Sequence, residues 1–157
     1  YVSIPLRANY DDAIKLLDNL RVRKMLEKHE KNIGESKPLK ADWYEKHKPY
    51  MGAYSKRLEE VLPELFVKWQ KNLGVRAAKI RIKDTRSQWG SCNVKNHNIS
   101  ISVWLGAFPE ECIEYVVVHE LVHLLEKGHN ARFYGYLDQH YPAWKMCEGK
   151  LKSIWKS

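Results

Sequence analysis

The segment 116–133, VVVHELVHLLEKGHNARF, places three histidines and a glutamate in the most apolar stretch of the chain. Imidazoles and carboxylates are costly to bury in an apolar helix unless a partner compensates them. His119 and His123 are four residues apart, so on an α-helix they lie on one face, about one turn apart. Two imidazoles in that position can bind one metal ion, which removes the cost. The segment therefore predicts a buried helix that carries a metal site.

The pattern H-E-x-x-H is typical of zinc hydrolases, in which the histidines bind the ion and the glutamate accepts a proton from water. Catalytic zinc takes three protein ligands and keeps one position open. His129 is the nearest third ligand, because Gly128 can end the helix in a left-handed turn. We expect one Zn²⁺ per chain, bound by His119, His123 and His129, with Glu120 as general base. Nickel, cobalt and copper also suit three histidines, so zinc is a preference from geometry and availability.

Hydrophobic periodicity predicts both helices and strands. Helices are expected over 11–31, 52–72, 109–127, 131–140 and 143–156, and strands over 1–8, 78–83 and 98–105. Pro63 is expected to kink or split its helix, and Gly74 to end it. The two later strands flank one long loop, so we expect them to pair antiparallel. Segment 32–49 is expected to be a connector, with a short turn around Trp43 and Tyr44.

The length of 157 residues suits one domain, and we expect a single domain over 1–157 with its metal-binding core over 75–157. No apolar run approaches the roughly 20 residues that cross a bilayer, so we expect no membrane partner. The chain begins at Tyr1, inside an expected strand. We therefore expect it to be incomplete at its N-terminus.

Cysteine content and net charge indicate the cellular compartment and the kind of binding partner. Cys92, Cys112 and Cys147 are odd in number and far apart in the sequence, which favours reduced thiols in a cytoplasmic protein. The net charge of +8 favours anionic partners such as nucleic acid. The lysines are spread along the chain and do not form one block, so solvated helix faces are the more common explanation.

Segment 81–155 resembles the YgjP-like metallopeptidases, a family related to the SprT and WLM zinc peptidases. The resemblance rests on TRSQWGSC (85–92), NISISVWL (98–105), FPEECIEYVVVHELVHL (108–124), GHNARFYGYL (128–137) and YPAW (141–144). It implies a zincin-like α+β fold, in which a small antiparallel or mixed sheet packs on a buried H-E-x-x-H helix with additional helices. It also implies zinc on the three histidines, with Glu120 as catalytic acid/base. Metzincins share this histidine spacing, but Glu126 stands at their glycine position and no methionine-turn pattern follows.

The resemblance also suggests residues that contact the substrate. Its R-x-x-W-G-S segment corresponds to Arg86, Trp89, Gly90 and Ser91, which are expected to position a strand beside the cleft. Arg86 can pair with a carboxylate or a phosphate, and Trp89 suits either the cleft or the core. Strand 99–104 is expected to be the edge that pairs with an extended peptide. Candidate donors to an oxyanion, each more often a packing or surface residue, are Tyr134, Tyr115 and His140.

These features favour a zinc-dependent hydrolase, and a peptidase acting on peptides or proteins is the first hypothesis. Two alternatives stay open. One is a metal-dependent hydrolase of nucleotides or other phosphoanhydrides, in which Arg86 would clamp phosphate. The other is a zinc-stabilised module without catalysis that binds nucleic acid.

Overall fold

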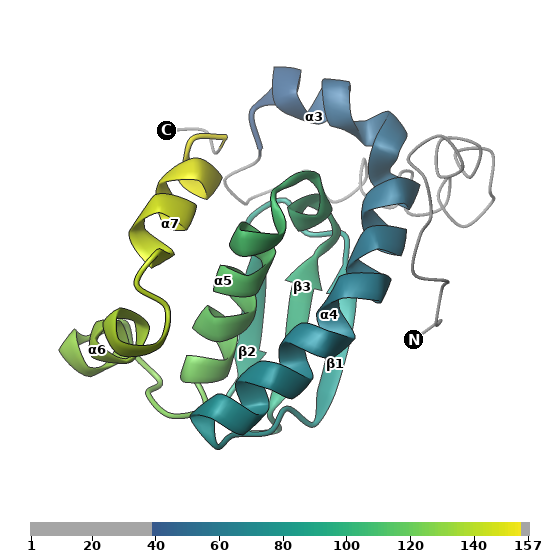
Figure 1. The fold of residues 1–157 in the computed structure, drawn as a ribbon. Coiled ribbons are helices and arrows are strands. Elements are labelled where there is room, and N and C mark those ends of the chain that lie inside the picture. The colour runs from purple at the N-terminus through teal and green to yellow at the C-terminus, as the bar shows by residue number, and fades with distance from the viewer. Residues whose placement is uncertain (1–38, 155–157) are drawn as a thin grey trace.

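The computed structural model describes residues 39–154, so the expected strand 1–8 and helix 11–31 lie outside the described residues. Within this range a small sheet packs on a group of helices (Figure 1). The strands are β1 (Lys79–Lys83), β2 (Gly90–Asn93) and β3 (Asn98–Ser102); the α-helices are α3 (Ala41–His47), α4 (Met51–Leu73), α5 (Glu110–Val122), α6 (Ala131–His140) and α7 (Trp144–Lys152). Short 3-10 helices, η2 (Lys48–Tyr50) and η3 (Val103–Ala107), precede α4 and α5. The expected α+β class is confirmed.

The sheet has the order β1-β3-β2, with β1 parallel to β3 and β2 antiparallel to β3. The predicted antiparallel pairing of 78–83 with 98–105 is therefore wrong in direction. The loop between β1 and β3 contains β2, which runs in the opposite direction to β1. The chain reverses direction again at the turn that contains His97, where φ is 61°. Two reversals leave β3 running the same way as β1. Among residues 39–154, β3 is therefore the central strand and β1 and β2 are the edges, of which β2 contacts α5.

Helix α4 runs without a break through Pro63, so of the predicted kink or split at this residue the split is wrong. Pro63 lies on the exposed side of the helix. Buried side chains before and after it, Leu58 and Phe66 among them, hold both halves of α4 against the core. Tertiary packing thus outweighs the local preference of proline. Gly74 ends the helix in the left-handed conformation with φ of 67°, as predicted.

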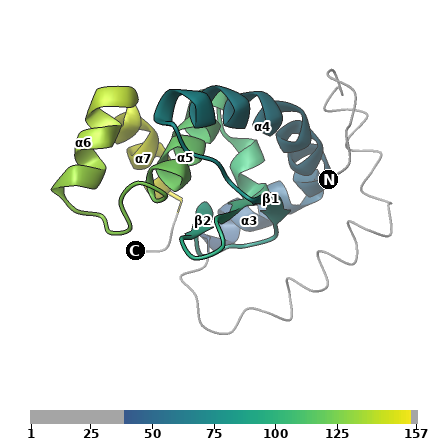
Figure 2. The same cartoon turned by 90° about the horizontal axis from the view of Figure 1, so that it is seen from below.

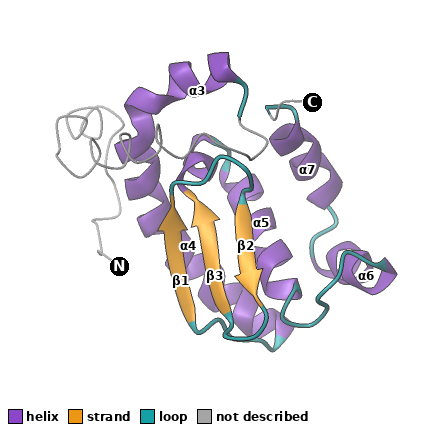
Figure 3. Cartoon of the chain, turned by 180° about the vertical axis from the view of Figure 1, so that it is seen from behind, coloured by secondary structure: helices purple, strands orange, loops and turns teal. Residues whose placement is uncertain are grey.

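Helix α5 is the most deeply buried helix, and it contacts α4, α6, α7 and the sheet. Together with α4 it covers one face of the sheet, and α7 lies beside α5 on the side away from α4 (Figures 2 and 3). It begins directly after Pro109, as expected, but ends at Val122 and not near Lys127. The backbone N–H groups of Leu124 and Leu125 bond three residues back, which tightens the chain into a turn. The chain therefore leaves the helix axis close to His123.

The remaining helices differ in how well the sequence predicts them. Helix α6 has the predicted bounds, whereas α7 is shorter than the predicted helix 143–156. Helix α3 replaces the expected turn around Trp43 and Tyr44, and it packs with Trp104 of η3 in a second apolar cluster. None of the helices in the described part of the chain is long and apolar enough to cross a membrane.

Candidate active site

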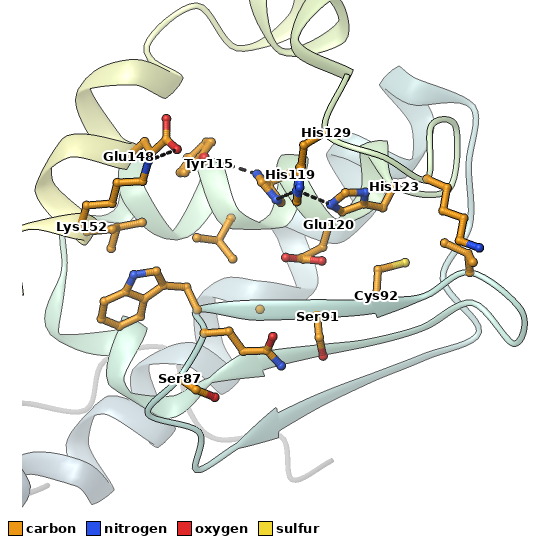
Figure 4. Close-up of a pocket in the computed structure, with 17 residues that line it drawn as sticks. Ser87, Ser91, Cys92, Tyr115, His119, Glu120, His123, His129, Glu148 and Lys152 are labelled. Carbon is orange, nitrogen blue, oxygen red and sulfur yellow. Dashed lines mark hydrogen bonds and ion pairs between the residues drawn. The ribbon is translucent and has the colours of Figure 1, made fainter. Parts of the chain in front are cut away.

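His119, His123 and His129 meet at one point (Figure 4). The first two lie one turn apart at the end of α5, and the third comes from the loop between α5 and α6. The Nε2 atom of His129 lies 3.0 Å from that of His123 and 3.2 Å from that of His119. Three imidazole nitrogens that converge in this way suit a metal ion with a three-histidine ligand set. The donor set therefore fits the zinc that the sequence predicts.

His129 reaches this point without the left-handed turn predicted at Gly128, because Gly74 is the only glycine of residues 39–154 with a positive φ. Side-chain bonds fix the loop instead. Asn130 caps α6 by accepting from the N–H of Phe133, and its amide donates to the Glu126 carboxylate at 2.8 Å. The chain is thereby held in a shape that turns His129 back toward α5.

The outer nitrogens of two of these histidines also have partners. Nδ1 of His119 lies 3.3 Å from the Tyr115 hydroxyl, and Nδ1 of His123 lies 3.2 Å from the backbone carbonyl of Glu126. The buried ring of Phe133 contacts all three imidazoles, with centroids 4.6 to 4.9 Å apart. Such contacts orient a histidine so that Nε2 faces the ion.

Burial also controls the protonation of the site. It lowers the pKa of His119 to about 3, with the nearby His123 and His129 adding to the effect, and it lowers the pKa of His123. Imidazoles with lowered pKa values are neutral at neutral pH, which is the form that binds metals. Burial raises the pKa of Glu120 to about 8, and its side chain is only 5% exposed.

The histidines and Glu120 line one pocket of about 570 Å³. Its walls come from β2 with the loop before it, from α5, from the loop around His129, and from α7. The contribution of α7 consists of Glu148, Leu151 and Lys152, which lie on one face of that helix. The sequence analysis did not find these three residues. Their spacing is that of any amphipathic helix, and only the packing of α7 on α5 brings them to the site.

The residues proposed for substrate contact are dispersed. Trp89 lines the pocket and packs edge to face on Phe108 at 5.1 Å. The guanidinium of Arg86 lies over the ring of Tyr44 at 4.3 Å, and it is not part of the pocket lining. Tyr134 packs on Phe133 and Trp144, also away from the lining. Of the other candidate oxyanion donors, Tyr115 lines the pocket and His140 does not.

The edge of β2 presents backbone groups to the pocket. The N–H of Ser102 donates to the carbonyl of Trp89, and the register pairs Gly90 with Ile101 and Ser91 with Ser100. In an antiparallel ladder bonded pairs alternate with unbonded ones. The N–H and C=O groups of Gly90 and Cys92 therefore point away from β3. Since both residues line the pocket, these groups are available to a bound chain.

Comparison with known proteins supports the family resemblance. The sequence model of the YgjP-like metallopeptidase domain matches residues 8–154. The solved zymogen of abylysin, a metallopeptidase of Pyrococcus abyssi, is similar with a TM-score of 0.53 and 21% identity, over 58% of this chain and 91% of that chain. The zymogen of jannalysin, a metallopeptidase of Methanocaldococcus jannaschii, gives a TM-score of 0.49 and 21% identity over 61% and 94%. No curated protein matches this sequence. The match over nearly the whole chain shows that this protein belongs to the YgjP-like metallopeptidase family.

Proposed function

We propose that this chain is a zinc-dependent peptidase, with His119, His123 and His129 as ligands and Glu120 as general base. The observation that carries the proposal is the convergence of three Nε2 atoms in a pocket that also holds a buried carboxylate. Membership of a metallopeptidase family supports peptides or proteins as substrates. The choice of zinc rests on the ligand set.

Zinc, if held by His119, His123 and His129, would make a water molecule more acidic and would polarise the substrate carbonyl, so that the carbonyl carbon becomes more electrophilic. Glu120 follows His119 on α5 and faces the pocket beside the histidines (Figure 4). The positive charge of bound zinc would oppose the effect of burial on the pKa of Glu120 and favour its ionised form. That carboxylate would accept the proton of the attacking water, and the resulting carboxylic acid would donate it to the nitrogen of the leaving amine. Tyr115 and the carbonyl of Glu126 keep two of the ligating rings in orientation during these steps.

The substrate is proposed to lie along β2. The earlier candidate, strand 99–104, has neighbours on both sides over its β3 residues, so it has no edge to offer there. The outward groups of Gly90 and Cys92 can bond an extended peptide and place it beside Glu120. We include Trp89 as a wall of this subsite and assign no substrate contact to Arg86 or Tyr134, which lie outside the pocket lining.

No contact among the described residues favours either alternative function. The phosphoanhydride hydrolase was to use Arg86 as a clamp, but this residue stacks on Tyr44 and is not among the residues that line the pocket. The nucleic-acid module rests on net charge alone. Both stay as outcomes that a panel of nucleotides and a DNA titration at two salt concentrations can detect.

The test is Glu120→Gln, measured with zinc-loaded protein on a mixture of fluorescence-quenched peptides. The variant should bind about one zinc per chain, like the wild type, and lose hydrolysis by at least about 10²-fold, because the amide cannot accept the proton. Glu114→Gln is the matched control, since Glu114 lies on the same helix but pairs with Lys68 and Trp69. Undiminished turnover in Glu120→Gln would refute the mechanism.

A further inference from the structure

We infer that Gly90 positions the Glu120 carboxylate, because only a residue without a side chain lets β2 pass as close to α5 as it does. Gly90 is a positioning residue in this scheme and takes no part in the chemistry. The inference rests on the proposed role of Glu120 as general base.

A side chain at residue 90 would come too close to two residues of α5. A Cβ atom at residue 90 would lie 2.9 Å from Cγ and 3.0 Å from Oε1 of Glu120, and 3.0 Å from Cγ1 of Val116. Side-chain carbons seldom approach closer than about 3.4 Å, so an alanine here requires a shift of several tenths of an ångström. The atoms that would have to move include the carboxylate itself.

The backbones of α5 and β2 are both held by their neighbours, whereas the Glu120 side chain borders the pocket. Glu120 is 5% exposed and Val116 is 3% exposed, and both lie on the helix at the centre of the core. On the other side, β2 is held by its ladder with β3 and by the bond between Trp89 and Ser102. In a close-packed interior such a strain is relieved by the group that can move most easily. Here that group is the Glu120 side chain, whose χ angles can change without moving the backbone.

Gly90 also lies between Glu120, the proposed general base, and the edge of β2 that is proposed to bind the substrate. A side chain at residue 90 would face Glu120, and the N–H and C=O groups of Gly90 point away from β3, past the edge of the sheet and toward the pocket. A peptide that bonds to Gly90 is therefore placed at a set distance from the carboxylate. An added methyl group changes this distance but leaves the three histidines on α5 and its following loop untouched. The expected defect lies in kcat, with smaller changes in KM and in metal content.

The experiment compares Gly90→Ala with Gly135→Ala, a control on α6 where an added Cβ meets no atom within 4 Å. With the same peptide mixture, Gly90→Ala should keep about one zinc per chain and lose about tenfold in kcat, because a displacement of about 1 Å can cost about 10²-fold and the shift needed here is several tenths of an ångström. Gly135→Ala should resemble the wild type. A Gly90→Ala variant with kcat within about twofold of wild type would overturn the inference.

Crystal structures of wild type and Gly90→Ala decide the geometric part without any turnover. The inference predicts a displaced Glu120 carboxylate beside unmoved histidines, and an unmoved carboxylate refutes it. If the wild type hydrolyses no peptide, the proposed function fails while these structures still test the position. Should Gly90→Ala fold poorly, Gly90→Ala/Val116→Ala removes one of the close contacts. Recovery of kcat to the level of Val116→Ala alone would show that Val116, not Glu120, is the neighbour that matters.

Discussion

Replacement of Tyr115 by phenylalanine should weaken metal binding without unfolding the site. The ring of Tyr115 is 5% exposed and contacts His119 edge to face at 5.7 Å, and phenylalanine keeps this packing. The change removes only the hydroxyl that lies 3.3 Å from Nδ1 of His119. Loss of such a partner lowers metal affinity by roughly 10- to 100-fold. Since 3.3 Å is at the long end for a hydrogen bond, we expect the lower value, about tenfold or 1.4 kcal/mol.

The assay is a titration of zinc against a chromogenic chelator, with the cobalt absorption spectrum as a second measure of ligand geometry. Tyr141→Phe is the matched control, because Tyr141 stacks on Tyr115 and donates to the carbonyl of Glu111 at 2.7 Å. It should lower stability but leave metal affinity unchanged. The reasoning is refuted if Tyr115→Phe binds zinc within about twofold of wild type, or if Tyr141→Phe loses as much affinity.

Two further predictions concern the metal and the thiols. His129→Ala should lose most of its zinc by elemental mass spectrometry, whereas His140→Ala, outside the pocket lining, should keep it. Zinc at 100 times its Kd should stabilise the wild type by about 2.7 kcal/mol in urea unfolding, and chelator should abolish this gain. Burial raises the pKa of Cys147 to about 12 and also raises that of Cys112. Since unfolded thiols ionise near pH 8.5, stability should be full below about that pH and fall toward pH 12. Urea unfolding at about pH 7 and pH 10 measures the fall, and a pH-independent stability contradicts it.

The features that could be predicted from the sequence are those that depend on local patterns. The four-residue spacing of His119 and His123 depends only on helix geometry, and the structure brings these residues together with His129. Helix α6 has the bounds expected from the sequence, and in the structure Asn130 caps its start. The start of α5 follows from Pro109 and the acidic residues after it. Each of these features is decided within a few residues of chain.

Features decided by distant contacts were missed or wrong. The direction of β3 depends on β2, a four-residue strand whose sequence GSCN has no strand pattern. Pro63 is tolerated because residues far along the chain pack on both halves of α4. The approach of Gly90 to Glu120, and the position of Glu148 in the pocket wall, likewise arise from packing between elements. No window of sequence contains both partners of such a contact.

The two edge strands of the sheet, as the structure describes it for residues 39–154, differ in a way that bears on self-association. Strand β1 carries Lys79, Arg81 and Lys83 on exposed positions, the kind of charge that keeps an edge from pairing with another molecule. Strand β2 carries no charged residue, and its outward backbone groups face the pocket. If β2 binds the substrate as proposed, its edge cannot carry such charges without hindering the peptide. We therefore expect edge-to-edge aggregation of this chain, where it occurs, to begin at β2 and to be suppressed by any peptide that occupies the site.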